Sequence, residues 1–185
     1  MDLTEKTLRS EQVFTGGFLQ VTRAEVALPD GNVATREFIR HPGAAAVLAL
    51  TDDGRLVMER QYRYPAGREF IEIPAGKLDP AELPHDTARR ELLEETGFTA
   101  RQWLYLGKAW PCIGYADEVI HYYLATGLAQ QARQLDDGEF LEVQLLLLDE
   151  VQQMALNGEI ADSKTIVGLH WLAAWQQGKL PGETV

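Results

Sequence analysis

The sequence predicts an α+β fold, with a mixed β-sheet sandwiched by helices and an antiparallel β unit before it. Strand-like segments outnumber helical ones along the 185 residues. The helical segments are interspersed among the strands rather than alternating strictly with them, which argues against an all-parallel sheet. The length is enough for one domain with a substantial core, or for one domain with a small appendage.

The first 41 residues are expected to form the β unit, and residues 42–185 the main domain. Residues 18–41 contain two β-rich runs around the turn Pro-Asp-Gly-Asn. Within this turn Gly31 tolerates the positive φ of a tight hairpin. The junction between the two parts is the segment HPGAAA.

The main domain begins with further strand signals. A second hairpin is predicted from residues 44–51 and 56–64, which the turn DDGR separates. Residues 68–76 alternate apolar and polar side chains, as a half-buried strand does. Three later runs complete the expected strands: WLYLGKAW, EVIHYYLAT and FLEVQLLLL.

The first helix of the main domain carries a crowded acidic face. It is expected to begin near Asp86 or Thr87, both good N-caps, and to end at Gly97. Three glutamates fall at positions i, i+3 and i+4 and therefore point to one side: Glu91, Glu94 and Glu95. Like charges at this spacing destabilise an isolated helix by about 0.2–0.5 kcal/mol per pair.

Two further helices are expected near the C-terminus. The segment DEVQQMALNG is helical by its spacing. The last helix covers residues 163–178, with Asp162 or Ser163 as its N-cap and Gly178 as its C-cap. Its apolar face is expected to contain four residues: Ile166, Leu169, Leu172 and Ala173.

The composition argues against several classes of partner and location. Against 17 Lys and Arg stand 28 Asp and Glu, and the net charge of −11 disfavours a nucleic-acid backbone. No apolar run approaches the about 18 residues of a membrane-spanning helix, and the polar N-terminus lacks the features of a signal peptide. Cys112 is the only cysteine, so no intrachain disulfide is possible and the reducing cytoplasm is expected.

The glutamates of the first helix have two interpretations. One is a solvated acidic face, the usual environment of such residues. The other is a metal site, because Ala75 precedes a tight turn that would leave its carbonyl free of ladder bonds and directed at the helix. Carboxylates with a carbonyl and waters form an all-oxygen shell that suits Mg²⁺ or Mn²⁺. Arg90 either pairs with Glu82 and orients this shell, or forms an ordinary i,i+4 pair with Glu94.

The spacing of these residues resembles the complete Nudix box. Its specified positions are all filled, in order, by Gly76, Glu82, Arg90, Glu91, Leu92, Glu94, Glu95, Gly97 and Phe98. The resemblance implies a Nudix fold and Mg²⁺-dependent hydrolysis of a nucleoside diphosphate linked to another moiety. It also implies that Glu91, Glu94 and Glu95 ligate the metal with the carbonyl of Ala75, and that Glu95 and Arg90 belong to the catalytic machinery.

Outside the box, the chain is similar to the ADP-ribose pyrophosphatase branch of this family. In that branch an N-terminal β unit usually exchanges between the subunits of a homodimer. The segment QYRYP resembles a substrate-contacting segment and assigns that contact to Arg63. The segment DDGEFLEV resembles a late acidic loop, which makes Glu139 the catalytic base or an extra metal ligand, with Glu142 as the reserve candidate.

The substrate loop of the branch is matched less closely. GYADE resembles it and places Gly114 and Glu118 near the ribose and phosphates. Where the branch often has Ser-Pro-Gly, this chain reads Cys-Ile-Gly and its proline, Pro111, comes earlier, so the sugar specificity stays open. A looser resemblance assigns the nucleotide to three residues of the β unit: Phe18, Arg36 and Glu37. For Phe18 the alternative is a core position of the first hairpin.

The function expected from the resemblance is hydrolysis of a nucleoside diphosphate sugar, with ADP-ribose giving AMP and ribose 5-phosphate. Another nucleoside diphosphate sugar, such as GDP-mannose, is the alternative within the same reaction class. A catalytically silent nucleotide-sugar sensor is the alternative from another class. Such proteins commonly lose glutamates of the box, whereas this chain keeps all of them.

Overall fold

The computed structural model describes residues 1–135 and 138–185. It divides into two compact units. The first unit comprises Met1–Pro42 and Trp110–Val119, and the second comprises Gly43–Ala109 and Ile120–Val185. The boundary between Pro42 and Gly43 lies one residue after the expected one. Residues 110–119 were expected in the main domain but belong to the first unit.

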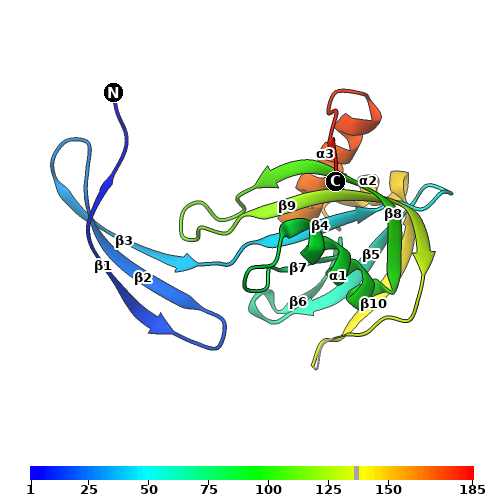
Figure 1. Cartoon of the computed structure of the whole chain (residues 1–185), viewed down its shortest axis with the longest axis horizontal. Coiled ribbons are helices and arrows are strands. Elements are labelled where there is room, and N and C mark those ends of the chain that lie inside the picture. The colour runs from blue at the N-terminus through cyan, green and yellow to red at the C-terminus, as the bar shows by residue number, and fades with distance from the viewer. Residues whose placement is uncertain (136–137) are drawn as a thin grey trace. The chain divides into compact units, whose positions relative to one another are not determined.

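The first unit is built on a three-stranded antiparallel sheet in the order β1-β2-β3 (Figure 1). Its strands are β1 (Lys6–Thr15), β2 (Gln20–Ala27) and β3 (Val33–Arg40). The predicted hairpin is present, and Gly31 in its turn has φ 88°. Strand β1 was not expected, because it has no buried face: all of its residues are exposed and give no apolar alternation to recognise.

The segment 110–119 is attached to the end of β3 by backbone and ionic contacts. The Ile39 N–H donates to the carbonyl of Tyr115 at 2.8 Å. Arg40 Nη1 lies 2.7 Å from Asp117 Oδ2, and the second oxygen of Asp117 accepts from the His41 N–H at 2.8 Å. The candidate substrate loop therefore belongs structurally to the first unit.

The second unit contains two sheets. The larger sheet has the strand order β11-β8-β9-β4-β7, and the smaller has the order β10-β5-β6. Because β4 and β9 are parallel while the other pairs are antiparallel, the larger sheet is mixed. The strands are β4 (Ala44–Ala49), β5 (Arg55–Arg63), β6 (Arg68–Glu72), β7 (Ala75–Lys77), β8 (Phe98–Ala109), β9 (Ile120–Gln130), β10 (Leu141–Leu147) and β11 (Glu183–Thr184).

The predicted second hairpin is wrong in its pairing, although both of its strands exist. Strand β4 pairs with β7 and β9, whereas β5 pairs with β6 and β10 in the other sheet. A single bridge, Leu50 to Leu56, joins the two runs beside their turn. Both runs are apolar enough to be buried on two faces, so each finds partners elsewhere in the chain.

Three α-helices belong to the second unit: α1 (Pro84–Thr96), α2 (Leu148–Leu156) and α3 (Ser163–Gln176). A short 3₁₀ turn, η1 (Tyr64–Ala66), follows β5. Helix α1 ends at Gly97 with φ 75°, as predicted. Its start was mispredicted: Leu83 is the N-cap and Pro84 occupies the first turn, where its fixed φ and missing N–H fit.

Helix α3 begins as expected, because the Asp162 side chain accepts from the Thr165 N–H at 3.0 Å. Its C-cap is Gln177, one residue before the expected Gly178. Leu169 and Leu172 are buried, but Ile166 is 43% exposed. The buried face is turned toward Thr165 and Gly168 instead, so the expected apolar face was partly wrong.

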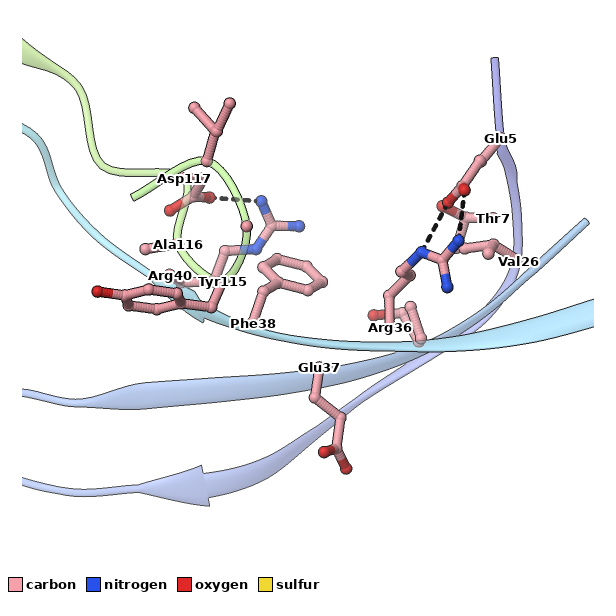
Figure 2. A pocket seen from close by; sticks show the side chains of 14 residues that line it. Glu5, Thr7, Val26, Arg36, Glu37, Phe38, Arg40, Tyr115, Ala116 and Asp117 are labelled. Carbon is pink, nitrogen blue, oxygen red and sulfur yellow. Dashed lines mark hydrogen bonds and ion pairs between the residues drawn. The ribbon is translucent and has the colours of Figure 1, made fainter. Parts of the chain in front are cut away.

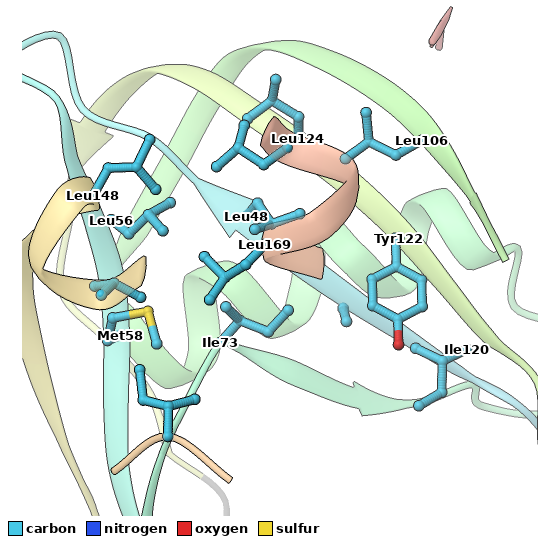
Figure 3. Close-up of a cluster of buried hydrophobic side chains, with 14 of the residues drawn as sticks. Leu48, Leu56, Met58, Ile73, Leu106, Ile120, Tyr122, Leu124, Leu148 and Leu169 are labelled. Atoms are coloured by element: carbon cyan, nitrogen blue, oxygen red, sulfur yellow. The ribbon is translucent and has the colours of Figure 1, made fainter. Parts of the chain in front are cut away.

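Two clusters of buried side chains form the core on opposite faces of β4. Leu48 belongs to the cluster that α2 and α3 cover, and Figure 3 shows Leu169 of α3 among its members. The next residue back, Val47, belongs to the cluster that contains Leu92 of α1. Helices therefore sandwich the sheet layer, as the α+β prediction requires. Among the described helices none is long and apolar enough to cross a membrane.

Candidate active site

Helix α1 is held against the sheet by its apolar side, and this brings one of its glutamates inside. Ala88 and Leu92 are fully buried in the cluster that also contains Val47 of β4. Glu95 lies one turn beyond and is only 4% exposed. Its carboxylate accepts a hydrogen bond from the Ala75 N–H at 3.1 Å. The interpretation of the acidic face as a solvated surface therefore fails for Glu95.

Arg90 makes both of the contacts that the sequence left as alternatives. Its guanidinium donates twice to Glu82, from Nε at 2.9 Å and from Nη2 at 2.8 Å. Its Nη1 donates to Glu91 at 2.8 Å and to Glu94 at 3.0 Å. Hydrogen bonding by Arg90 is the main reason that the pKa of Glu82 falls to about 2. Arg90 therefore ties the loop before α1 to two carboxylates of the helix.

The backbone of β7 leaves the Ala75 carbonyl outside the sheet ladder. Ala75 lies opposite Ala46, and the Val47 N–H donates to the carbonyl of Pro74 beside this pair at 2.9 Å. This pattern is that of a non-hydrogen-bonded antiparallel pair, in which the N–H and C=O of each residue point away from the partner strand. The Ala75 N–H accordingly reaches Glu95, and its carbonyl is likewise turned away from β4.

Gly76 makes room for the Glu91 carboxylate. A Cβ atom at this position would lie 1.8 Å from Glu91 Oε1 and 2.4 Å from Oε2. No side-chain carbon tolerates such contacts, so the absence of a side chain at Gly76 lets Glu91 lie directly against β7. Burial is the main cause of the raised pKa of Glu91, and Arg90 partly offsets it.

A cross-strand pair of buried glutamates on β5 and β6 was not predicted from the sequence. Glu59 lies opposite Glu72, and each is only 3% exposed. Arg63 holds Glu72 with two hydrogen bonds, from Nε at 2.8 Å and from Nη2 at 2.7 Å. Lys164 of α3 also donates to Glu72, and it donates to Asp162 at 3.0 Å. The predicted substrate contact, Arg63, is thus anchored by a buried carboxylate.

Glu59 has no such compensation. Its Oε1 is buried and has no hydrogen-bond partner among the described residues. Burial, more than the charges of Glu72 and Glu139, raises the pKa of Glu59 to about 8, while Lys164 opposes the shift. Burial also raises the pKa of Glu95, and the charge of Glu59 adds to this effect. The alternation of β5, with Val57 and Glu59 on one face, was the signal that could have located this residue.

The two candidates for the late acidic residue differ in their surroundings. Glu139 Oε1 lies 3.5 Å from Nε2 of Gln61, and its charge raises the pKa values of Glu59 and Glu95. Glu142 instead lies 2.7 Å from Arg60, and its side chain is 66% exposed. Of the two candidates, Glu139 is therefore the one whose charge acts on the buried carboxyl groups of Glu59 and Glu95.

This set of residues fits a divalent cation in its chemistry. Hard oxygen donors come from three places: the buried Glu59 oxygen without a hydrogen-bond partner, the Glu91 carboxylate that Gly76 accommodates, and the Ala75 carbonyl that is turned away from β4. Among the described residues no three acidic, histidine or cysteine side chains are arranged to enclose an ion. Part of the reason is that the Glu91 and Glu94 carboxylates are directed toward Arg90, which donates a hydrogen bond to each of them.

Two of the nucleotide-binding candidates of the β unit line a pocket of about 460 Å³ within the first unit, together with Gly114 (Figure 2). Arg36 points into it and donates to Glu5, with Nε 3.0 Å from Oε2. Glu37 follows on the strand, and its carboxylate is directed away from the other labelled side chains, toward Arg23 at 2.8 Å. Strand alternation explains the opposite directions of these neighbours.

The other two candidates of the first unit meet at His41. The Phe18 ring packs edge-on against the His41 ring with 5.5 Å between centroids. Glu118 Oε1 lies 3.6 Å from His41 Nε2. Phe18 is 48% exposed, so the alternative of a hairpin core position is not what the structure shows. Arg63, Ala75 and the box glutamates all belong to the second unit.

Several proteins are similar to this chain over most of its length. It is 41% identical over 172 residues to an ADP-ribose pyrophosphatase of Bacillus subtilis, covering 92% of this chain and 93% of the relative. It is 44% identical over 170 residues to a methanol dehydrogenase activator of Bacillus methanolicus, covering 91% and 92%. Its fold matches the crystal structure of an ADP compounds hydrolase with a TM-score of 0.84 and 22% identity, over 97% of this chain and 98% of that one.

Two family models account for nearly the whole chain. The model of a nucleoside diphosphate sugar hydrolase N-terminal domain matches residues 5–39, which contain β1, β2 and all but the last residue of β3. The model of the NUDIX domain matches residues 40–167, which contain β4 to β10, α1 and all the buried glutamates described above. With more than half of its length matched in this way, the chain belongs to the Nudix family.

Proposed function

We propose that this protein is a Mg²⁺-dependent pyrophosphohydrolase of nucleoside diphosphate sugars and that its preferred substrate is ADP-ribose, cleaved to AMP and ribose 5-phosphate. The observation that carries the proposal is the pair of buried carboxyl groups of Glu95 on α1 and Glu59 on β5, the second of which has an oxygen without a hydrogen-bond partner among the described residues. The 41% identity to an ADP-ribose pyrophosphatase supports the choice of substrate.

The metal site of this proposal consists of Glu91, Glu94 and Glu95 with the Ala75 carbonyl. A bound Mg²⁺, or Mn²⁺ in its place, would neutralise the pyrophosphate and acidify a water molecule. Arg90 fixes the positions of Glu91 and Glu94, to which it donates hydrogen bonds. Helix α1 therefore orients the carboxylates before any substrate binds, which reduces the reorganisation needed for reaction.

In the proposed reaction, one P–O bond to water forms and one P–O bond of the pyrophosphate breaks. The oxygen of a water molecule bonds to one phosphorus, and the bridging oxygen leaves with the other phosphate. Glu139 takes the proton of the attacking water as general base. Arg63 contacts the charged substrate, and its two hydrogen bonds to Glu72 hold the guanidinium in a fixed orientation.

The first unit is proposed to supply the remaining substrate contacts, from Phe18, Arg36, Glu37, Gly114 and Glu118. The half-exposed ring of Phe18 offers a face for the base. We further propose a cytoplasmic homodimer in which residues 1–41 exchange between subunits, because β1 exposes Leu8, Val13 and Phe14. The mass of the protein in solution tests this, and a monomer at micromolar concentration would contradict it.

A substrate panel tests the proposed activity. Purified protein is incubated with Mg²⁺ and separately with Mn²⁺, and kcat/KM is measured for ADP-ribose, GDP-mannose and other nucleoside diphosphate sugars. The expected result is the highest value for ADP-ribose with AMP as product. A higher value for GDP-mannose would replace the substrate but keep the reaction class. No cation-dependent turnover of any member would overturn the proposal.

A further inference from the structure

The cross-strand glutamates Glu59 and Glu72 are the same residue type and are equally buried, but they differ in the positively charged side chains that donate hydrogen bonds to them. Both are 3% exposed and face each other across β5 and β6. Like charges directly opposite on a sheet destabilise it unless something neutralises them. Arg63 and Lys164 both donate to Glu72. For Glu59 the structure shows no hydrogen bond to Oε1 within the described part of the chain.

The cations near Glu59 are already engaged. Lys164 attracts Glu59 and Arg63 does so more weakly, but Lys164 donates its hydrogen bonds to Glu72 and Asp162, and Arg63 donates to Glu72. Glu72 and Glu139 are among the negative groups that act on Glu59. A buried carboxylate in such a position is costly unless a positive partner is supplied from outside the chain.

The direction of the Glu59 side chain is toward α1 and its glutamates. Val57, two residues before it on the same face of β5, packs in the cluster that contains Ala88 and Leu92 of α1. Glu95 follows Leu92 by about one turn on the same side of α1 and is 4% exposed. Glu59 and Glu95 therefore lie at the edge of the same buried cluster, each on a different element.

We infer that Glu59 is a further carboxylate of the divalent-cation site, acting on the cation together with Glu91 and Glu95. Carboxylate oxygens are the ligands that hard divalent cations prefer, either directly or through a bound water. The inference rests on the proposed function for the existence of the site, but it concerns cation affinity rather than turnover. It assigns a role to a buried carboxyl group that lies outside the Nudix box, residues 76–98.

Cation binding without substrate tests this inference. The full-length protein and its variants are titrated with Mn²⁺, and free Mn²⁺ is measured by electron paramagnetic resonance. Glu59→Gln keeps the volume of the side chain and removes its charge, and we expect it to weaken Mn²⁺ binding about 10- to 100-fold. Glu95→Gln serves as the positive control for lost affinity. Glu69→Gln is the matched control, because Glu69 lies on β6 with its side chain 55% exposed and pairs with Arg60.

Thermal unfolding in EDTA separates a role in cation binding from a role in the fold. Glu59→Gln is expected to unfold at the same or a higher temperature than wild type, because a neutral amide replaces a buried carboxyl group whose ionised form has no positive partner of its own in the fold. Mn²⁺ should then raise its melting temperature less than that of wild type. Wild-type Mn²⁺ affinity in Glu59→Gln, or a lower melting temperature in EDTA, overturns the inference. Turnover of ADP-ribose by the wild type under either outcome leaves the proposed function standing.

Discussion

Two groups of carboxylates in the second unit are in opposite electrostatic situations. Glu82 lies in the loop before α1 and receives two hydrogen bonds from Arg90, one from the Thr87 hydroxyl and one from the Asp79 N–H. Its pKa is about 2. Glu59 and Glu95 are more deeply buried and have raised pKa values. The neighbours of Glu82 stabilise its charged form, whereas burial and neighbouring carboxylates destabilise the charged forms of Glu59 and Glu95.

This difference separates residues that maintain the structure from residues that are kept for chemistry. A carboxylate surrounded by donors stabilises the folded state, because its charged form gains more there than in water. A buried carboxylate among other carboxylates lowers stability and persists where a ligand or a reaction requires it. Substitutions in the first group should therefore affect stability most, and those in the second should affect activity most.

The largest effect is expected for Glu95→Gln. Hydrolysis of ADP-ribose with Mg²⁺ should fall below about one-thousandth of the wild-type rate, or about 4 kcal/mol of transition-state stabilisation. The glutamine oxygen can still accept from the Ala75 N–H, so the fold should remain intact. Rate measurements and circular dichroism check both parts. Near-normal turnover would remove Glu95 from the metal site and break the comparison.

A smaller effect is expected for Glu139→Gln. Loss of the general base should lower kcat by about 10²- to 10⁴-fold while KM changes little. Glu142→Gln is the comparison variant, because that side chain pairs with Arg60 and is 66% exposed. Its kcat should stay within a few-fold of wild type. A drop of less than tenfold in Glu139→Gln would transfer the role of base to Glu142 or to the box glutamates.

The smallest effect on activity, and a distinct one on stability, is expected for Glu82→Gln. The pKa of Glu82 in the folded protein lies below the ordinary value of about 4.3, so its stabilising contribution is complete above that pH. The contribution is lost as pH falls toward 2. Urea unfolding should show Glu82→Gln to be less stable than wild type by about 1–3 kcal/mol at pH 7.

The pH series supplies the control for this last prediction. The gap in unfolding free energy between wild type and Glu82→Gln should shrink steadily between about pH 4.3 and pH 2, as Glu82 becomes protonated in both states. Glu69→Gln, which removes an exposed pair, should change stability by no more than about 1 kcal/mol at any pH. A gap of the same size at pH 7 and at pH 3 would show that the Arg90 contacts do not stabilise the fold.

The local features of the fold were predictable from the sequence, and the non-local ones were not. Gly97 ends α1 because a positive φ at a helix C-terminus depends on a few neighbouring residues. The pairing of β4 with β9 depends on residues 76 positions apart, which periodicity cannot reveal. The start of α1 was misplaced because Asp86 was considered as a cap, whereas Pro84 already fixes the first turn.

The same division applies to the candidate site. The contacts of Arg90 with Glu82 and Glu94 lie within eight residues and were foreseen. The contact between Lys164 and Glu72 joins residues 92 positions apart, and only the folded chain brings them together. Glu59 was missed because it follows the apolar residues 56–58, and a single glutamate after such a run usually indicates that the buried part of a strand has ended.

The hydrogen bond from the Ala75 N–H to Glu95 has a consequence for observing the site. Most amides of a strand bond to a neighbouring strand, and their exchange with solvent reports on opening of the sheet. The Ala75 amide bonds to a carboxylate instead, so its nuclear magnetic resonance frequency and exchange rate follow the position of that carboxylate. A single backbone nitrogen can thus serve as a spectroscopic indicator of whether Glu95 is turned toward the strand or away from it.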